Sequence, residues 1–454
     1  MKKLLVLSFY FLSATLLFVS CDNEDEDPIL TEPTNNIVEL AVQNGFTSLA
    51  TALTKAGLVD DLEANGSFTV FAPTNAAFDA LLTEIGQSSI DDVPADVLEQ
   101  ILLYHVVGSK VKSDQITAGD VTTLEGTSVA LSTTGGIKVN DVAVINPFDV
   151  EATNGVIHTI NQVLVPASIG QFVNTVLEPA YFSESFTTLI TAAVKADVVG
   201  TLLNTPNLTI FGPTNDAFAA AGINPNDIDK ETLAAVLTYH VVGAKVMSSG
   251  IPREATTVNG NNIYFSLTGG GNFINGSTEI VAVDIESGTG VVHVIDNVLL
   301  PPAGNIVETA ISLSADGEFT SLIAALQRTA NEGTPEQNLI TVLSSDGPFS
   351  VFAPTNAAFQ AVLDSNNDWN TLNDIPLETL ISVLAYHVVP ARAYDKDLAG
   401  AVDANSELPT ANGQNLKFDL KALTINSNVN IVGVNAHATN GVIHVIDAVI
   451  LPAL

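Results

Sequence analysis

The sequence is poor in cysteine, in basic residues and in aromatic residues. Cys21 is the only cysteine, which excludes a disulfide bond within one chain. The 15 lysines and arginines face 50 aspartates and glutamates, so the formal net charge is −35. Such a chain repels nucleic-acid phosphates and anionic lipid headgroups, which excludes nucleic acid as a partner. Aromatic residues make up 6% of the chain, with Trp369 as the one tryptophan, so few rings are available to stack on sugars.

A long apolar run lies at the N-terminus, from Leu4 to Val19, directly after Lys2 and Lys3. This pattern is typical of a secretory signal and is too short for a confident membrane span. Cys21 follows it at once, an arrangement that resembles a bacterial lipoprotein signal, in which the cysteine becomes the lipidated first residue. The next residues, DNEDED, resemble the acidic surface-export tag of Bacteroidetes lipoproteins. We therefore expect a signal peptide over 1–20, lipidation at Cys21, an acidic spacer over 21–35, and an exported protein held to the outer membrane by its lipid alone, facing the cell surface.

Three motifs recur in the same order three times. The front motif is FAPTNAAF at 71–78 and 352–359, and FGPTNDAF at 211–218. A Tyr-His-Val-Val motif follows, and then a back motif, which is ATNGVIH in the first and third copies and GTGVVH in the second. The front-motif threonines lie 140 and 141 residues apart, a period long enough for each unit to bury its own core. We therefore predict three tandem domains over 36–168, 169–303 and 304–454.

The pattern within each unit predicts an α+β fold. Each unit opens with a helical pattern, as over 46–58, and continues with a short strand that ends in proline. A second helix starts after that proline, and a third, over 94–103 in the first unit, leads into a strand that carries the Tyr-His pair. Alternating strands with turn signals fill the second half. We expect an N-terminal helical part packed on a twisted, mainly antiparallel β-sheet.

The front and back motifs are given structural roles. The Thr-Asn pair after the proline is predicted to cap the second helix, and Asn-Gly of the back motif is predicted to supply the two positive-φ residues of a type I′ turn. The histidine that follows is expected to lie in a central strand with its ring nitrogens bonded inside the core. These residues are Thr74, Asn75, Asn154, Gly155, His158, Thr214, Asn215, Gly290, His293, Thr355, Asn356, Asn440, Gly441 and His444.

Taken together, the three motifs resemble the fasciclin-like domain, in three copies over roughly 36–454. The resemblance implies an extracellular adhesion or matrix-interaction module. In that family the Tyr-His segment and an Asp-Ile pair before the back strand are linked to receptor contact. Carried over by position, the candidate partner-binding residues are Tyr104, His105, Asp149, Val150, Tyr239, His240, Asp284, Ile285, Tyr386 and His387. The third unit has Asn435 and Ala436 in place of the Asp-Ile pair, and the Tyr-His residues could instead serve only packing and internal hydrogen bonding.

The sequence offers little for catalysis or metal binding. Six of the seven histidines occupy equivalent places, and no further ligand recurs at metal-ligand spacing. Residues 364–369 begin like a calcium loop but have Trp369 where glycine is required. His437 is unique to the third unit and is expected at the surface. We expect no enzyme activity, metal or cofactor, and a surface adhesion protein with an extracellular protein or matrix partner. A glycan-binding lipoprotein is the alternative.

Overall fold

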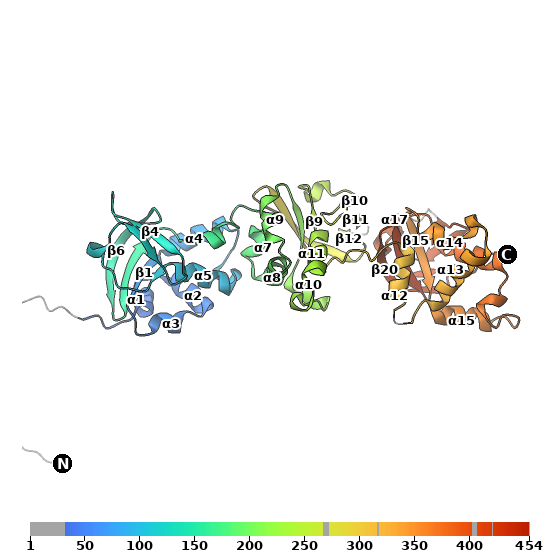
Figure 1. Ribbon diagram of the computed structural model, residues 1–454, viewed down its shortest axis with the longest axis horizontal. Helices are drawn as coiled ribbons and strands as arrows, with labels where there is room; N and C mark the ends of the chain where they lie inside the picture. The colour runs from blue at the N-terminus through green and yellow to red at the C-terminus, as the bar shows by residue number, and fades with distance from the viewer. Residues whose placement is uncertain (1–31, 267–271, 316, 402–405, 420, 454) are drawn as a thin grey trace, which may run out of the picture.

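The computed structural model describes residues 32–453 apart from 267–271, 316, 402–405 and 420. The expected signal peptide, Cys21 and most of the acidic spacer lie outside the described residues. Three domains follow one another along the long axis of the molecule, each with helices on a seven-stranded sheet (Figure 1). No helix within the described ranges is both long and apolar enough to cross a membrane.

The elements of the first domain are α1 Ile37–Gln43, α2 Thr47–Ala56, α3 Val59–Glu63, β1 Phe68–Pro73, α4 Asn75–Glu84, η1 Ile90–Asp92, α5 Ala95–Tyr104, β2 Val106–Val107, η2 Ser113–Gln115, β3 Gly119–Thr122, β4 Ser128–Ser132, β5 Lys138–Val139, β6 Val142–Ala152 and β7 Gly155–Ile160. Those of the second are α6 Ala167–Gly170, α7 Glu178–Tyr181, η3 Glu184–Phe186, α8 Thr187–Lys195, α9 Val199–Asn204, β8 Thr209–Pro213, α10 Asn215–Ala220, η4 Pro225–Asp227, α11 Lys230–Tyr239, β9 Val241–Val242, η5 Ser248–Gly250, β10 Glu254–Thr256, β11 Asn262–Ser266, β12 Phe273–Ile274, β13 Thr278–Ser287 and β14 Gly290–Ile295. Those of the third are α12 Ile306–Leu313, α13 Thr320–Glu332, η6 Pro335–Gln337, α14 Leu339–Leu343, β15 Phe349–Pro354, α15 Asn356–Asp364, η7 Leu372–Asp374, α16 Leu377–Tyr386, β16 Val388–Val389, α17 Asp395–Ala401, β17 Glu407–Pro409, β18 Asn415–Asp419, β19 Thr424–Ile425, β20 Val429–Ala438 and β21 Gly441–Ile446.

Each sheet has the same strand order, which in the first domain is β2-β1-β7-β6-β5-β4-β3. The neighbouring strands pair antiparallel, except β1 and β7, which run parallel from Phe68↔Gly155 to Pro73↔Ile160. The sheet is therefore mixed, and its parallel pair joins the front motif to the back motif. β7 is buried along its whole length, as expected for a strand at the centre of a sheet.

The threonine of the front motif caps the helix that follows it. The Thr74 side chain accepts a hydrogen bond from the Ala77 amide at 3.2 Å. The neighbouring asparagine does something else, because Asn75 Oδ1 accepts from the Ser48 amide at 3.0 Å and its Nδ2 donates to the Gly45 carbonyl. Asn75 therefore ties the start of α2 to the start of α4.

The prediction of a type I′ turn at Asn-Gly of the back motif is wrong. Neither Asn154 nor Gly155 has positive φ, whereas Asn140 and Asp141, between β5 and β6, have φ of 47° and 65°. Gly155 is required by close approach instead, since a Cβ there would lie 2.3 Å from the Phe68 carbonyl oxygen. The repeated heptapeptide is thus explained by packing between distant segments.

Asn154 holds the N-terminal helices to the back strand. Its Oδ1 accepts from the Ile37 amide at 3.0 Å, at the start of α1. Its Nδ2 donates to the carbonyls of Leu62 and Ala64 at 2.7 and 3.0 Å, at the end of α3. Asn440 makes the same three bonds in the third domain. In the second domain Thr289 replaces this asparagine and accepts one bond, from the amide of residue 207 at 3.2 Å.

Candidate interaction surface

The Tyr-His pair lies at the end of a helix and not in a strand, which corrects the sequence-based prediction. Tyr104 is the last residue of α5 and His105 is its C-cap. The helix extends this far because His105 Nδ1 donates to the Ile101 carbonyl at 2.7 Å, one turn back, and thus satisfies a terminal carbonyl. Its Nε2 accepts from the Leu164 amide at 2.8 Å. Each ring nitrogen therefore has a partner in the neutral imidazole.

The histidines of the Tyr-His pairs are buried in the core and are neutral at pH 7. Burial lowers the pKa of His105 to about 4, and the hydrogen bond to the Ile101 carbonyl opposes this only in part. His240 and His387 have the same pattern of bonds, and burial lowers the pKa of each to about 4. These histidines are 1 to 2% exposed.

The tyrosines hold the type I′ turns of the sheet. The Tyr104 hydroxyl donates to the Ser128 carbonyl at 3.2 Å and accepts from Asn140 Nδ2 at 2.8 Å. Tyr239 bonds Asn275 and Tyr386 bonds Asn426 in the same way. The role of these asparagines was not predicted from the sequence, although Asn140 stands two residues before β6, and Asn275 and Asn426 stand three residues before β13 and β20. All three Tyr-His pairs are thus bonded within their own domains.

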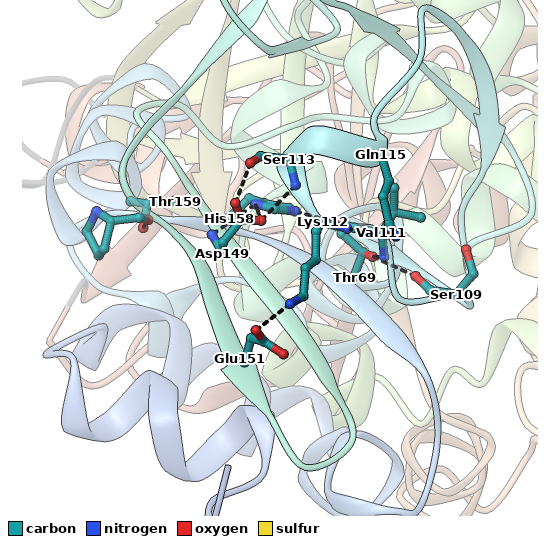
Figure 2. Close-up of polar contacts among 11 residues, drawn as sticks. Thr69, Ser109, Val111, Lys112, Ser113, Gln115, Asp149, Glu151, His158 and Thr159 are labelled. Atoms are coloured by element: carbon teal, nitrogen blue, oxygen red, sulfur yellow. Dashed lines mark hydrogen bonds and ion pairs between the residues drawn. The ribbon is translucent and has the colours of Figure 1, made fainter. Parts of the chain in front are cut away.

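The Asp-Val pair lies at a second place, on an irregular part of β6, which we call the Asp149 corner (Figure 2). The pairing of β6 with β7 shifts register between Ile145 and Val150, and Asp149 has a φ of 56°. The Asp149 carboxylate accepts from the Ser113 amide at 2.7 Å and from the Ser113 hydroxyl. These two hydrogen bonds hold the start of η2 against the bulge in β6.

His158 of β7 is hydrogen-bonded to both segments of this corner. Its Nδ1 accepts from the Asp149 amide at 3.4 Å, and its Nε2 donates to the Val111 carbonyl at 2.9 Å. The ring is fully buried and lies 5.9 Å from the ring of Phe71. The histidine of the back motif therefore positions the main chain of both segments, and its two nitrogens are engaged by protein atoms.

A cluster of opposite charges borders the corner. Lys110 and Lys112 reach Glu151 at 2.9 and 2.5 Å. The hydrogen bond and charge of Glu151 raise the pKa of Lys112, and the two lysines lower the pKa of Glu151. These side chains are 31 to 40% exposed, so their pairing adds little to stability and leaves them open to an incoming partner.

The second domain repeats the corner with Ser248, Asp284 and His293. The Asp284 carboxylate accepts from the Ser248 amide at 2.7 Å, and His293 Nε2 donates to the Val246 carbonyl at 2.8 Å. The hydrogen bonds from Ser248 hold the pKa of Asp284 below its usual value. Lys245 pairs with Glu286 beside it, as Lys110 does with Glu151.

The third domain has a different corner, and the second domain packs on it. Asn435 replaces the aspartate and bonds Asp395. The guanidinium of Arg392 lies 3.9 Å from the ring centre of Tyr264 in the second domain. The prediction that His437 lies at the surface is wrong. Its Nδ1 accepts from the Tyr394 hydroxyl at 2.8 Å, and its ring lies 5.8 Å from that of Tyr264. Burial and then Arg392 lower its pKa to about 3.

The first two corners present apolar side chains to solvent. Phe148 is 42% exposed directly before Asp149, and Val281 and Val283 are 55% and 40% exposed before Asp284. These apolar side chains are exposed, and the neighbouring aspartate is held by Ser113 or Ser248, so the arrangement suits docking of a protein surface. These apolar residues were not predicted from the sequence, where their one signal is their place beside the aspartate. Among the described residues, no hydrogen bond joins the corner to the Tyr-His pair.

The remaining candidate residues for metal binding and catalysis have structural partners. No group of three or more His, Cys, Asp or Glu side chains within the described ranges could hold a metal ion. The threonines of the front motif cap helices, and the two repeated histidines of each domain bond different backbone groups. His444 departs from the expectation that both ring nitrogens are bonded, because its Nε2 donates to the Ala393 carbonyl at 2.9 Å but its buried Nδ1 has no hydrogen-bond partner among the described residues.

Comparison with known proteins gives consistent results. The fasciclin domain family model matches residues 44–166, 184–301 and 317–452. The chain is 30% identical over 439 residues to transforming growth factor-beta-induced protein ig-h3 of Sus scrofa, a match that covers 94% of this chain and 59% of that protein. It is 26% identical over 443 residues to periostin of Homo sapiens, covering 94% of this chain and 48% of periostin. The chain thus spans about half to three-fifths of the length of these relatives.

A bacterial relative and a solved structure match shorter stretches. Protein sll1483 of Synechocystis is 44% identical over 138 residues, covering 30% of this chain and 76% of that protein. A FAS1 domain pair from the insect cell adhesion molecule Fasciclin I is 18% identical, with a TM-score of 0.30, and covers 59% of this chain and 97% of that one. Because the family model matches three times over most of the sequence, the chain belongs to the fasciclin domain family.

Proposed function

We propose that the protein is a cell-surface adhesion protein that binds an extracellular protein partner through the corners at Asp149 and Asp284. The observation that carries this proposal is the pairing of an aspartate fixed by Ser113 or Ser248 with exposed apolar side chains on the bulged strand. Membership of the fasciclin domain family supports it. We further propose that lipidation at Cys21 holds the exported chain at the outer membrane.

Two corners on one chain suit weak, repeated contacts. Each is small, so a single corner offers only modest affinity, and two linked corners raise the effective concentration of the second contact. In the third domain Asn435 replaces the aspartate and Arg392 packs on Tyr264 of the second domain, while Val432 and Val434 stay 58% and 42% exposed. Because the carboxylate is missing there, we assign the contact to the first two domains. The Tyr-His pairs contribute through the fold, since they fix the turns and the start of β2.

The test compares corner variants of the chain lacking residues 1–31 on immobilised proteins from cell-surface extract. Asp149→Ala with Asp284→Ala removes the carboxylates that fix both corners, and we expect binding to fall at least tenfold. Asp149→Asn with Asp284→Asn keeps the acceptor geometry that Asn435 shows in the third domain, and separates charge from shape. Asp120→Ala, on the exposed strand β3, is the control. Unchanged binding by the double alanine variant would refute the proposal.

The alternative function, glycan capture, has one structural feature in its favour. A cleft of about 480 Å³ between the second and third domains is lined by Arg253, Arg392, Tyr264 and Tyr394. Aromatic rings and guanidinium groups are common in sugar sites. However, Arg392 already covers one face of Tyr264, and Tyr394 is 1% exposed. Neither ring is free for sugar stacking, so a protein partner is favoured.

A further inference from the structure

An apolar groove of about 650 Å³ lies at the free end of the third domain, far from the corners described above. Trp369, Leu380 and Val383 line it together with the chain after β21, and Glu378 and Ser382 are among its polar groups. Pockets of this volume, mainly apolar with a few polar groups, are typical of binding sites. No part of the described chain fills it.

In the first domain the equivalent face, which is formed by α5, is covered by other parts of the chain. Tyr104 and Tyr386 end α5 and α16, which have equal length, so Ile101 corresponds to Val383 and Asp96 to Glu378. Ile101 is 1% exposed, whereas Val383 is only half-buried. The chain after the back strand shows the same contrast, because Pro166 is buried and Val165 half-buried, whereas the equivalent Pro452 is half-buried and Leu451 is 58% exposed.

The cover on the first domain is the start of the second. The side of the first domain that carries α5 faces α7 and α8 (Figure 1), and Phe172 belongs to the same continuous core cluster as Ile101. The ring of Phe172 stacks on that of Tyr181 with centroids 3.7 Å apart. An ion pair between Lys55 and Glu184 at 3.0 Å closes the junction.

Tyr181 is the residue of this cover that brings a hydroxyl to the junction. Its side chain packs against the core cluster that contains Ile101, and burial, with a smaller effect of the charge of Asp96, raises its pKa to about 12. The position of Asp96 is taken by Glu378 in the open groove. The groove therefore repeats the apolar floor against which Tyr181 packs in the first domain, and it carries a carboxylate at the position of Asp96.

We propose that this groove binds a tyrosine presented on a short helical turn of a partner protein, with its ring on Val383 and Leu451 and its hydroxyl toward Glu378. A second copy of the chain is a poor occupant for two reasons. Its own Tyr181 is engaged with its first domain, and two copies that each carry a formal charge of −35 repel one another. This surface is separate from the Asp149 corner, so the inference does not depend on the proposed function.

The sole tryptophan of the chain provides the readout, since Trp369 lines the groove. The probe is a synthetic peptide of residues 171–186, which contains Tyr181 and no tryptophan. Titrated into the chain lacking residues 1–31, it is expected to change Trp369 emission in a saturable manner. A peptide with Tyr181→Ala is expected to bind at least tenfold more weakly. N-acetyl-tyrosine amide, compared with N-acetyl-alanine amide, serves as a second probe that needs no helical fold.

Protein variants locate the binding. Leu451→Asp puts a charge on the groove at a residue that is 58% exposed, and is expected to abolish the response. Leu300→Asp is the matched control, because it is the equivalent position of the second domain and is 57% exposed. The inference is overturned if neither probe changes Trp369 emission, if both peptides act alike, or if Leu451→Asp responds normally. It is also overturned if sedimentation shows a dimer that Leu451→Asp dissociates, which would assign the groove to a second copy.

Discussion

Replacing Asn440 with alanine tests whether the back motif holds its domain together through one side chain. The change removes the bond from the Ile306 amide at 2.8 Å and the bonds to the carbonyls of Leu343 and Ser345 at 2.8 and 2.6 Å. Asn440 is 6% exposed, so water cannot easily replace the lost partner. At about 1 kcal/mol for each bond, we expect the third domain to lose about 3 kcal/mol of unfolding free energy.

The assay is hydrogen exchange measured by mass spectrometry, because three domains in one chain do not unfold as a single two-state unit. Amides of α12 and β21 should exchange faster in Asn440→Ala, while the first domain stays unchanged. Asn367→Ala, at an exposed loop position, is the control and should alter stability by less than about 0.5 kcal/mol. A loss below about 1 kcal/mol in the third domain would refute the assignment of Asn440 as its clamp.

Three further outcomes are expected. The pKa of His387 falls from 6.5 to about 4 on folding, so its contribution to stability is complete above pH 6.5 and is lost as pH falls toward 4, by up to about 1.4 kcal/mol per pH unit. Urea unfolding of the third domain should show this decrease in unfolding free energy between pH 6.5 and 4, and His387→Gln should reduce it. Gly276→Ala would place a Cβ 2.6 Å from Tyr394 Cβ and should separate the second and third domains in small-angle scattering, whereas Gly260→Ala, also at positive φ but with open space, should not. Cys21→Ala should move the protein out of the membrane fraction, and an unchanged fraction would contradict lipidation there.

Much of the fold could be predicted from local sequence. The three copies follow from similar motifs at a nearly constant spacing, and Thr74 caps α4 because a hydroxyl after a proline-ended strand can reach the Ala77 amide three residues on. The central position of β7 follows from its unbroken apolar run. These features depend on residues close together in the chain, so the sequence alone determines them.

Contacts between distant residues decided the rest. The role of Asn154 depends on Ile37, 117 residues away, and Gly155 is needed because Phe68 packs against it in a parallel pair of strands. For the same reason His437, which is polar and unique in the sequence, becomes an interface residue only when the second domain is placed against it. The sequence thus determined that there are three similar domains, and only the tertiary structure decided which corner and which groove remain open, because covering one domain's surface requires the next domain to pack upon it.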